Sequence, residues 1–588
     1  MANTLAPVPA ADQGTDESCR ARPAVGPRAS RGTGSGRGTG LRTLIVVETL
    51  LALGLAVWAW VGDGRGVAAP AIAALVAASL IPFGGASLFG RAARHVRFRW
   101  ARSRRRAIDP APPPFDIPVT APDGEPTRRS APEDIVGARW VDGRLVMVLR
   151  IAPAAPTVTY LVPGLSSVDD PAGQVIPLEA LAECISPFDI ELESIDVVSH
   201  GVRMWGDGPA AAAYHRTLGP LSATAHRGVF VLLRLDPSSC AAAVARRGGG
   251  AVGALRTATI ATRRVANRLS ENGLQVSVLT ATEITAVTAE LAEGVPLDEM
   301  TEGWESVESG PVRFRSAAVD PAEFPTVLTS VWVNTALSTT VTLRLRHGTQ
   351  GQLEVAGVVR FAELPVAGRV AEPWPAGLGS LDGHQHDALA SGLPIGSPTT
   401  LDRQLPVVRG EAATEVLRSL ALPAGGCGQL VGADHGGRAI AVPLAGPAVR
   451  AALVVADDRF VAQLILRTIA IGAAVTIHTI RPAHWAALVT AVGDPRVLSV
   501  GSQRTAGVRA GHRVAVIDGV VPPPSEPGTT QIVVAEPCES PEHLPDTDVP
   551  VIIRQNPHAP QEIWITTPLQ RVRATMVATP EEWQLIRR

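Results

Sequence analysis

Two apolar stretches near the N-terminus constrain this chain most strongly. Residues 43–61 (TLIVVETLLALGLAVWAWV) are apolar except for Glu48, and residues 67–89 (VAAPAIAALVAASLIPFGGASLF) carry no charge. A helix needs about 20 apolar residues to cross the hydrocarbon core of a membrane, so both stretches are long enough. Only the short segment 62–66 separates them. The sequence therefore predicts a transmembrane helical hairpin over residues 43–90.

The distribution of arginine predicts the orientation of this hairpin. Six arginines precede the first span, eight lie between residues 91 and 106, and the connecting loop holds only Arg65. Basic residues stay on the cytoplasmic side, so both termini should face the cytoplasm from the cell inner (plasma) membrane. A cleaved signal peptide is the alternative, but the basic tail is long and a second span follows directly. The arginine run at 97–106 is expected to contact anionic membrane lipid.

Composition outside the two spans predicts the domain organisation. Residues 1–42 are rich in Gly, Ser, Pro and Arg, which indicates a disordered basic tail. Residues 91–131 are Arg-rich and then Pro-rich, as in a semi-rigid linker. Strands and helices alternate afterwards, which predicts a cytosolic α/β domain with antiparallel strands at 132–370 and a C-terminal cytosolic α/β domain at 371–588. The predicted fold class is thus an α/β cytosolic region, with two α/β units and an antiparallel section between them, anchored by an N-terminal two-helix transmembrane hairpin.

Local patterns place the elements of the first unit. Residues 139–151 are two extended runs around Asp142-Gly143, a strong hairpin signal. A helix is predicted over about 251–270, ended by Asn272-Gly273. Residues 311–361 alternate apolar with polar and are expected to form the antiparallel section without helices.

The segment 453–477, LVVADDRFVAQLILRTIAIGAAVTI, is predicted to be strand, turn, helix and strand. A nucleotide-binding protein would place its phosphate loop at this turn, yet the turn, Asp457-Asp458-Arg459-Phe460, has no glycine run. Carboxylates at a helix N-terminus complement the helix dipole and cap the first turn. They would also repel a phosphate. We therefore interpret the segment as core scaffold with an empty site.

Composition excludes several kinds of chemistry. The chain contains no lysine, because all 53 of its basic residues are arginines, so it has no phosphate-loop, Schiff-base or catalytic lysine. A formal net charge of −2 argues against a generally basic nucleic-acid binder. The cysteines are scattered and form no CxxC pair, so zinc sites and disulfide frameworks are not expected; they are Cys19, Cys184, Cys240, Cys427 and Cys538.

Two short patterns are candidate metal sites. His384 and His386, with Asp387, would share a face if they lay on a strand, but their Gly-rich surroundings favour a plain loop. Asp546-Thr547-Asp548 matches the DxD pattern that holds a divalent cation in many glycosyltransferases, and a solvated loop is the preferred interpretation. No metal ligand and no catalytic residue is assigned.

Two glycine-rich patterns are candidate sites for anions or cofactors. Gly377-Leu378-Gly379 has neither a preceding strand nor a following helix, so a dinucleotide fingerprint is not supported. Gly425-Gly426-Cys427-Gly428 would surround an anion with backbone N–H groups, but no group that would activate Cys427 adjoins it. A tight turn before a strand is the preferred interpretation, and no cofactor is assigned.

The order of several strings resembles one known family. The chain has a basic N-terminus, two close spans and an arginine-rich exit, followed by VGARWVDGRLVMVLRI, RVANRLSENGLQVSVLTATE, LDGHQHDALASGLPIG and LPAGGCGQLVGADHGGRAIAVPL. In this order they resemble EccE, a membrane component of type VII (ESX) secretion systems, over most of residues 43–500. The resemblance implies a non-catalytic structural subunit of the inner-membrane complex, beside subunits of the EccB, EccC and EccD types. A GC-rich, lysine-free sequence agrees with an actinobacterial source.

Two other functions are compatible with the sequence. One is a membrane-anchored, glycosyltransferase-like or nucleotide-using enzyme, which rests on Asp546, Asp548 and the predicted sheet. The other is a ligand-sensing module of the same membrane complex. The turn at 457–460 and the lack of convergent titratable groups argue against the enzyme.

Overall fold

A computed structural model describes much of the chain, with gaps; the described residues are 82–83, 86–87, 95–96, 98–99, 111–118, 135–152, 155–163, 174–186, 188–206, 208–365, 373–396, 399–446, 448–501, 513–524, 526, 528–537 and 549–587. The chain divides into two units, Met1–Val96 and Arg97–Arg588. In the first, β1 (Pro82–Phe83) pairs with β2 (Ala86–Ser87). The rest of both predicted spans, including Glu48, lies outside the described residues, as does the N-terminal tail. Among the described residues, no helix is both long and apolar enough to span a membrane.

The second unit contains an antiparallel sheet of 13 strands within the described residues. Its main path runs β10-β11-β12-β14-β13-β7-β8-β5-β4-β3, and β9, β15 and β16 pair at its sides. The section predicted for 311–361 therefore belongs to the same sheet as the preceding strands. The strands are β3 (Phe115–Ile117), β4 (Val136–Val141), β5 (Arg144–Ile151), β7 (Ser194–Val202), β8 (His226–Leu235), β9 (Val276–Val278), β10 (Thr301–Glu302), β11 (Val307–Ser309), β12 (Val312–Val319), β13 (Ser338–His347), β14 (Leu353–Glu363), β15 (Leu378–Ser380) and β16 (Val408–Arg409).

The hairpin predicted around Asp142-Gly143 is confirmed as β4 and β5. Asp142 has a φ of 50° and Gly143 a φ of 79°. Positive φ at both central residues matches the right-handed twist of two strands joined by a two-residue turn. The local geometry of this turn thus fixes the register between β4 and β5.

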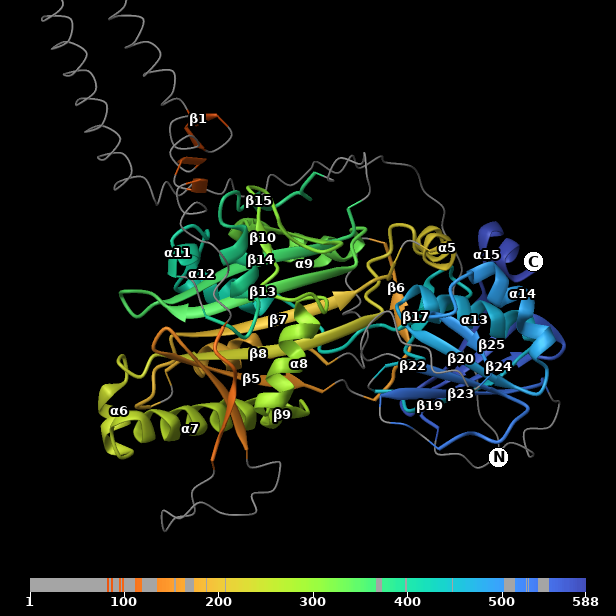
Figure 1. Ribbon diagram of the computed structural model, residues 1–588, viewed down its shortest axis with the longest axis horizontal. Helices are drawn as coiled ribbons and strands as arrows, with labels where there is room; N and C mark the ends of the chain where they lie inside the picture. Colours follow the sequence, from red (N-terminus) through yellow and green to blue (C-terminus); the bar gives the residue numbers. More distant parts are fainter. Residues whose placement is uncertain are drawn as a thin grey trace, which may run out of the picture. The chain divides into compact units, whose positions relative to one another are not determined.

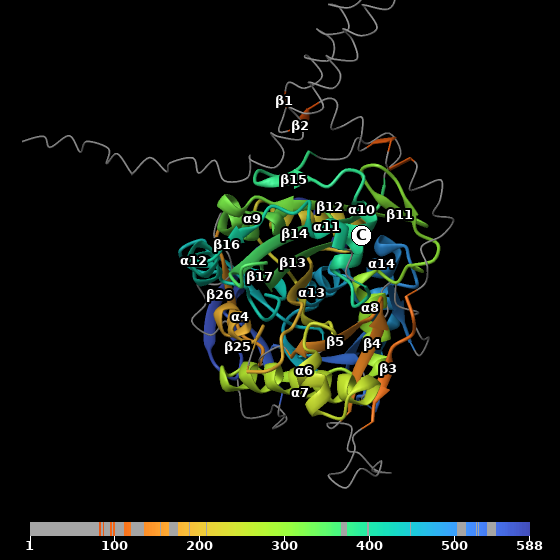
Figure 2. The same ribbon diagram turned by 90° about the vertical axis from the view of Figure 1, so that its left-hand side faces the viewer.

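Helices cover both faces of this sheet. α7 (Gly250–Glu271) packs through Ala258 and Val265 into one apolar cluster with Met147 of β5. α8 (Ala281–Leu291) packs into another cluster with Val148, the next residue of the same strand. Successive side chains on a strand point to opposite faces, so the two helices lie on opposite sides of the sheet (Figures 1 and 2). Of these helices, α7 confirms the predicted one.

Other helices flank the strands of this sheet. They are α4 (Leu178–Glu183), α5 (Pro209–Leu218), α6 (Ala241–Arg246), α9 (Phe324–Ser330), α10 (Gln385–Ser391), α11 (Thr399–Asp402) and α12 (Glu411–Ser419), with the short 3₁₀ turns η3 (Pro321–Glu323) and η4 (Val331–Val333). The expectation that 311–361 lacks helices is wrong at η3, α9 and η4. Phe324, Val327 and Val331 are buried at helical spacing. A Cβ added at Gly357 of β14 would lie 2.6 Å from the Phe324 ring, so that glycine makes room for α9.

A second sheet of 11 strands follows within the described residues. Six strands pair in parallel in the order β21-β20-β22-β23-β19-β24, and β25, β26, β17, β18 and β6 continue antiparallel. The strands are β6 (Thr159–Leu161), β17 (Gln429–Ala433), β18 (Ala439–Val442), β19 (Ala451–Val455), β20 (Ala474–Thr479), β21 (Leu498–Val500), β22 (Arg513–Asp518), β23 (Thr529–Ala535), β24 (Val551–Asn556), β25 (Ala559–Thr566) and β26 (Arg571–Met576). Its helices are α13 (Asp458–Ala470), α14 (Pro482–Val492) and α15 (Pro580–Arg587).

Strand pairing crosses the predicted boundary at residue 371 in both directions. β15 and β16 follow the boundary in sequence but pair with β12 and β14 of the first sheet. β6 precedes the boundary but pairs with β18 of the second sheet. These strands pair with residues far away in the sequence, so no local sequence pattern predicts the pairing.

Candidate functional site

The turn between β19 and α13 is a helix cap. The carboxylate of Asp457 accepts a hydrogen bond from the backbone N–H of Phe460 at 2.9 Å, which confirms its predicted role as a helix-start residue. The backbone N–H of Asp457 donates to Gln555 Oε1 at 2.6 Å, and Gln555 Nε2 donates to Asp457 Oδ2 at 3.0 Å. Gln555 lies on the neighbouring strand β24, so this cap also joins two parallel strands.

Arg481 links two carboxylates at the same edge of the sheet. Its Nη2 atom donates to Asp458 Oδ1 at 3.1 Å and to Asp518 Oδ1 at 2.9 Å. His484 Nε2 lies 3.0 Å from Asp458 Oδ2, and Trp485 Nε1 donates to Asp518 Oδ2 at 2.9 Å. These side chains follow β19, β20 and β22, whose carboxyl ends meet because the strands are parallel. The carboxyl edge of the second sheet is therefore closed by its own ion pairs.

The electrostatics of this edge favour the charged forms. The hydrogen bond to Asp518 is the main cause that raises the pKa of Arg481, and Asp458 adds to it. Burial raises the pKa of Asp518, but hydrogen bonds from Arg481, Thr479 and Trp485 together outweigh it, so the net pKa is below the ordinary value. An anion placed at the start of α13 would meet Asp457 and Asp458. This arrangement disfavours phosphate where a nucleotide fold would hold it.

The histidine segment does not form the predicted loop. His384 precedes α10 (Gln385–Ser391), so the segment enters a helix rather than a Gly-rich loop. His384 Nδ1 lies 4.0 Å from Asp387 Oδ2, and His386 Nδ1 lies 3.7 Å from Asp387 Oδ1. Within the described parts of the chain, no group of three or more His, Cys, Asp or Glu side chains is arranged to hold a metal ion. The DxD pattern at Asp546 and Asp548 lies outside those parts.

The glycine-rich segment before β17 bends at residues 424–425 and then runs beside residues 224–225, without the predicted tight turn. The backbone N–H of Cys427 donates to Thr224 O at 2.9 Å and that of Gly428 to Ala225 O at 3.1 Å, so these donors already have protein acceptors. Gly428 has a φ of +77°, and a Cβ there would lie 2.1 Å from the backbone N of Pro443. Burial raises the pKa of the Cys427 thiol to about 11. The other glycine pattern, at Gly377, adjoins β15 and therefore precedes a strand.

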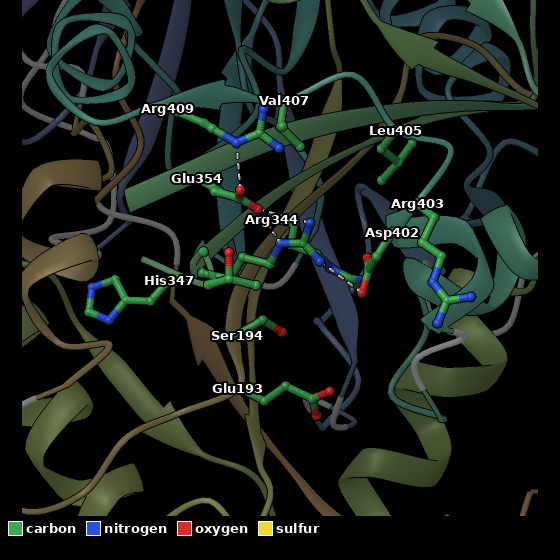
Figure 3. Close-up of a pocket in the computed structure, with 13 residues that line it drawn as sticks. Glu193, Ser194, Arg344, His347, Glu354, Asp402, Arg403, Leu405, Val407 and Arg409 are labelled. Atoms are coloured by element: carbon green, nitrogen blue, oxygen red, sulfur yellow. Dashed lines mark hydrogen bonds and ion pairs between the residues drawn. The ribbon is translucent and has the colours of Figure 1, made fainter. Parts of the chain in front are cut away.

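The sequence did not indicate a pocket that lies at one end of the first sheet (Figure 3). Its volume is about 560 Å³, within the range of small-molecule sites. Four arginines and three carboxylates line it, together with Ser194, His347 and the apolar residues Leu405 and Val407; the charged residues are Arg344, Arg346, Arg403, Arg409, Glu193, Glu354 and Asp402. They come from the start of β7, the β13–β14 hairpin and the segment between α11 and β16.

Buried arginines organise the inner wall of this pocket. Arg344 is 4% exposed, and its Nε and Nη2 atoms donate to the two oxygens of Asp196 at 3.0 and 2.9 Å. Its Nη1 atom donates to Asp402 at 2.5 Å. Arg234 also pairs with Asp196. A buried carboxylate between two guanidinium groups fixes their positions, because loss of either charge would leave an uncompensated one.

The outer wall has a second set of ion pairs. Glu354 accepts from Arg346 Nε at 3.0 Å and from Arg409 Nε at 2.7 Å, and Arg346 Nη1 lies 3.1 Å from Asp402 Oδ2. Glu193 pairs with Arg144 at 2.6 Å. Alternate arginines at 344 and 346 of β13 were the only sequence signal for this site. Their carboxylate partners lie on other segments, so the signal could not be interpreted alone.

Comparisons with known proteins show similarity to one family. Residues 223–318, from β8 to β12, match the family EccE, described as "Putative type VII ESX secretion system translocon, EccE". The ESX-1 secretion system protein EccE1 of Mycolicibacterium smegmatis is 26% identical over 386 residues, which is 65% of this chain and 70% of that protein. The ESX-5 secretion system protein EccE5 of Mycobacterium marinum is 26% identical over 276 residues, 45% of this chain and 66% of that protein.

A further relative matches a shorter part. The ESX-1 secretion system protein EccE1 of Mycobacterium tuberculosis is 28% identical over 179 residues, which is 30% of this chain and 36% of that protein. The pocket residues between 344 and 409 lie outside the segment that matches the family as a whole. Taken with the order of strings along the sequence, these matches show that the chain is similar to the EccE family of type VII (ESX) secretion system components.

Proposed function

We propose that this chain is a structural and assembly subunit, without catalytic activity, of the inner-membrane core complex of a type VII (ESX) secretion system. The observation that carries the proposal is the similarity to ESX secretion system proteins over 65% of the chain. The second sheet supports it, because Arg481 occupies the carboxyl edge between Asp458 and Asp518. These charges stabilise the fold and disfavour a phosphate-bearing substrate there.

The membrane attachment is part of the same proposal. The hairpin predicted over residues 43–90 would place both termini in the cytoplasm and pack against spans of neighbouring subunits. The domains after it would then dock on cytosolic parts of partners of the EccB, EccC and EccD types. Alkaline phosphatase fused within residues 62–66 should be active, and the same fusion after residue 131 should be inactive. Activity of the second fusion would contradict this topology.

Co-purification from native membranes tests the assembly role. The full chain, tagged at its C-terminus and extracted in mild detergent, should recover the EccB-, EccC- and EccD-type subunits. A matched variant lacking residues 43–90 should lose them, because it lacks the proposed membrane contacts. Recovery of the full chain alone, with the other subunits present in the same extract, would overturn the proposal.

A glycosyltransferase-like or nucleotide-using enzyme remains the competing function. Turnover distinguishes the two. Purified full chain, incubated with a sugar nucleotide and Mn²⁺, should release no nucleoside diphosphate above a protein-free control. Release that disappears in an Asp546→Asn/Asp548→Asn variant would establish the enzyme and contradict the structural role.

A further inference from the structure

The pocket at the end of the first sheet has hydrogen-bond donors that its own carboxylates do not use. Both oxygens of Glu354 are held, one by Arg346 and one by Arg409. Both oxygens of Asp402 are also held, by Arg344 and Arg346. A cation entering the pocket would have to displace an arginine from these carboxylates. The carboxylates of Glu354 and Asp402 are therefore already paired.

The unused groups are donors. Arg403 is exposed, lines the pocket, and has no hydrogen bond or ion pair to any described residue. Arg409 is 52% exposed, and only its Nε atom is bound, to Glu354, so its two Nη atoms remain available among the described residues. Guanidinium groups with free N–H pairs match the geometry of phosphate and carboxylate. The rim of the pocket is thus suited to an anion.

A buried hydroxyl on the inner wall points to a ligand independently. Ser194 is 3% exposed and lines the pocket, and its Oγ has no hydrogen-bond partner within the described structure. In Figure 3 this hydroxyl lies between Glu193 and the Arg344 side chain. A buried polar atom without a partner costs free energy, and such atoms are uncommon in folded proteins. A ligand oxygen in the pocket would satisfy it.

The shape of the wall limits the ligand further. Arg409 and Arg403 lie toward opposite sides of the pocket in Figure 3, with Val407 and Leu405 along the same segment between them. The guanidinium groups of Arg403 and Arg409 face the pocket from different sides in this view, so a ligand with one anionic group for each of them suits the wall better than a single small ion. The less polar part of such a ligand would lie against Val407 and Leu405.

We propose that this pocket binds a small organic anion that carries at least two phosphate or carboxylate groups. Arg403 and Arg409 hold the anionic groups at the rim, and Ser194 donates a hydrogen bond from the inner wall. Arg344 and Asp196 position this wall. The N–H groups of Arg344 already donate to Asp196 and Asp402, so they are not assigned to the ligand. The donors of Arg403, Arg409 and Ser194 can bind either phosphate or carboxylate oxygens, so the experiment below distinguishes a phosphate-bearing ligand from a carboxylate-bearing one.

Isothermal titration of the full-length chain in detergent tests the proposal, with pyrophosphate and citrate as separate probes at matched ionic strength. One or both should bind saturably, with one site per chain. Arg403→Gln and Arg409→Gln should each weaken binding by about tenfold or more, the effect of one lost hydrogen bond to a charged group. Arg450→Gln is the matched control, since Arg450 is an exposed arginine directly before β19 and does not line the pocket, so this variant should bind the probe as the wild type does.

Ser194→Ala separates ligand binding from folding. This variant removes a buried hydroxyl that has no protein partner, so the melting temperature of the ligand-free chain should stay unchanged or rise slightly. Its affinity for the probe should nevertheless fall. Saturable binding of pyrophosphate alone assigns phosphate chemistry, and binding of citrate alone assigns carboxylate chemistry; either supports the proposal.

Three results would overturn it. One is no saturable heat with either probe up to about 10 mM, a concentration at which even a millimolar site would be mostly occupied. Another is binding that Arg403→Gln, Arg409→Gln and Ser194→Ala leave unchanged. The third is a hexaglutamate peptide that binds at the same arginines more tightly than both small anions, which would assign the pocket to an acidic protein segment instead.

Discussion

Arg467 and Glu582 form a buried two-point ion pair between α13 and α15. Arg467 Nε donates to Glu582 Oε1 at 2.9 Å and Arg467 Nη2 donates to Glu582 Oε2 at 2.9 Å, and the two side chains are 0% and 2% exposed. Arg467 also donates to the backbone oxygens of Leu430 and Val577. The C-terminal helix is thereby fixed to the helix that follows β19. The buried arginine would be left without its counter-charge if Glu582 were removed.

Glu582→Ala is therefore expected to lower the free energy of unfolding by about 3–5 kcal/mol, the usual effect of leaving one buried charge unpaired. Thermal or urea unfolding of the full chain measures it. Asp494→Ala is the matched control, because Asp494 and Arg496 are 33% and 74% exposed and such a pair contributes only about 0–1 kcal/mol. Equal effects of the two substitutions would show that the buried pair does not hold α15.

Asp457→Ala should destabilise the second sheet through loss of the helix cap. The carboxylate accepts from Phe460 N at 2.9 Å, and removal of such a cap costs about 1 kcal/mol. Asp457→Ser should recover most of the loss, since a hydroxyl also accepts from the first turn. The melting temperatures of the two variants provide the comparison. Equal loss in both would indicate that the contact with Gln555, rather than the cap, is the important one.

The sequence was sufficient to predict those structural features that depend on neighbouring residues. The cap at Asp457, the helix α7 that ends before Asn272-Gly273 and the turn at Asp142-Gly143 each depend on neighbouring residues, and each is present as predicted. The helix α9 was missed because its buried residues Phe324 and Val327 lie within a stretch of β-branched and aromatic residues. Tertiary packing against Gly357 decided the conformation there.

The pocket could not be predicted for a different reason. Its residues come from segments near 194, 346 and 403, which are far apart in the sequence and meet only through strand pairing. Pairing over such distances depends on the whole sheet. No residue near Arg344 in the sequence indicates that Asp196 will lie opposite it. This pocket can therefore be recognised only from the three-dimensional structure.

The stability of the second sheet should depend on the ionisation of Asp518. Its pKa in the folded chain lies below the ordinary value, because hydrogen bonds from Arg481, Thr479 and Trp485 outweigh the effect of burial. A group with a lowered folded pKa stabilises the protein above its unfolded pKa, about 3.9 for aspartate, and the contribution is lost as the pH falls through the folded pKa.

Asp518→Asn is accordingly expected to be less stable than the wild type at pH 7, with a difference that is constant down to about pH 5 and shrinks below about pH 4. Melting temperatures of both chains across this range measure the difference. A gap that stays the same at pH 3, or widens there, would contradict the role given to the Asp518 carboxylate.

Cys427 should be unreactive in the folded chain. Burial raises the pKa of its thiol to about 11, and its Sγ donates to Thr224 O at 3.2 Å. Only the thiolate reacts with alkylating agents, so iodoacetamide at pH 8 should leave Cys427 unmodified. Peptide mass mapping measures whether Cys427 is alkylated, and the same chain labelled in urea provides the control. Rapid labelling of Cys427 without denaturant would show that the segment before β17 opens.

The structural role itself is tested most directly by the size of the membrane complex in cells that lack this chain. Native gel electrophoresis of mild-detergent extracts should show the complex absent or reduced in mass, and the full chain supplied in trans should restore both the complex and secretion. A complex of unchanged mass in the deletion strain, with secretion nevertheless lost, would contradict the structural role.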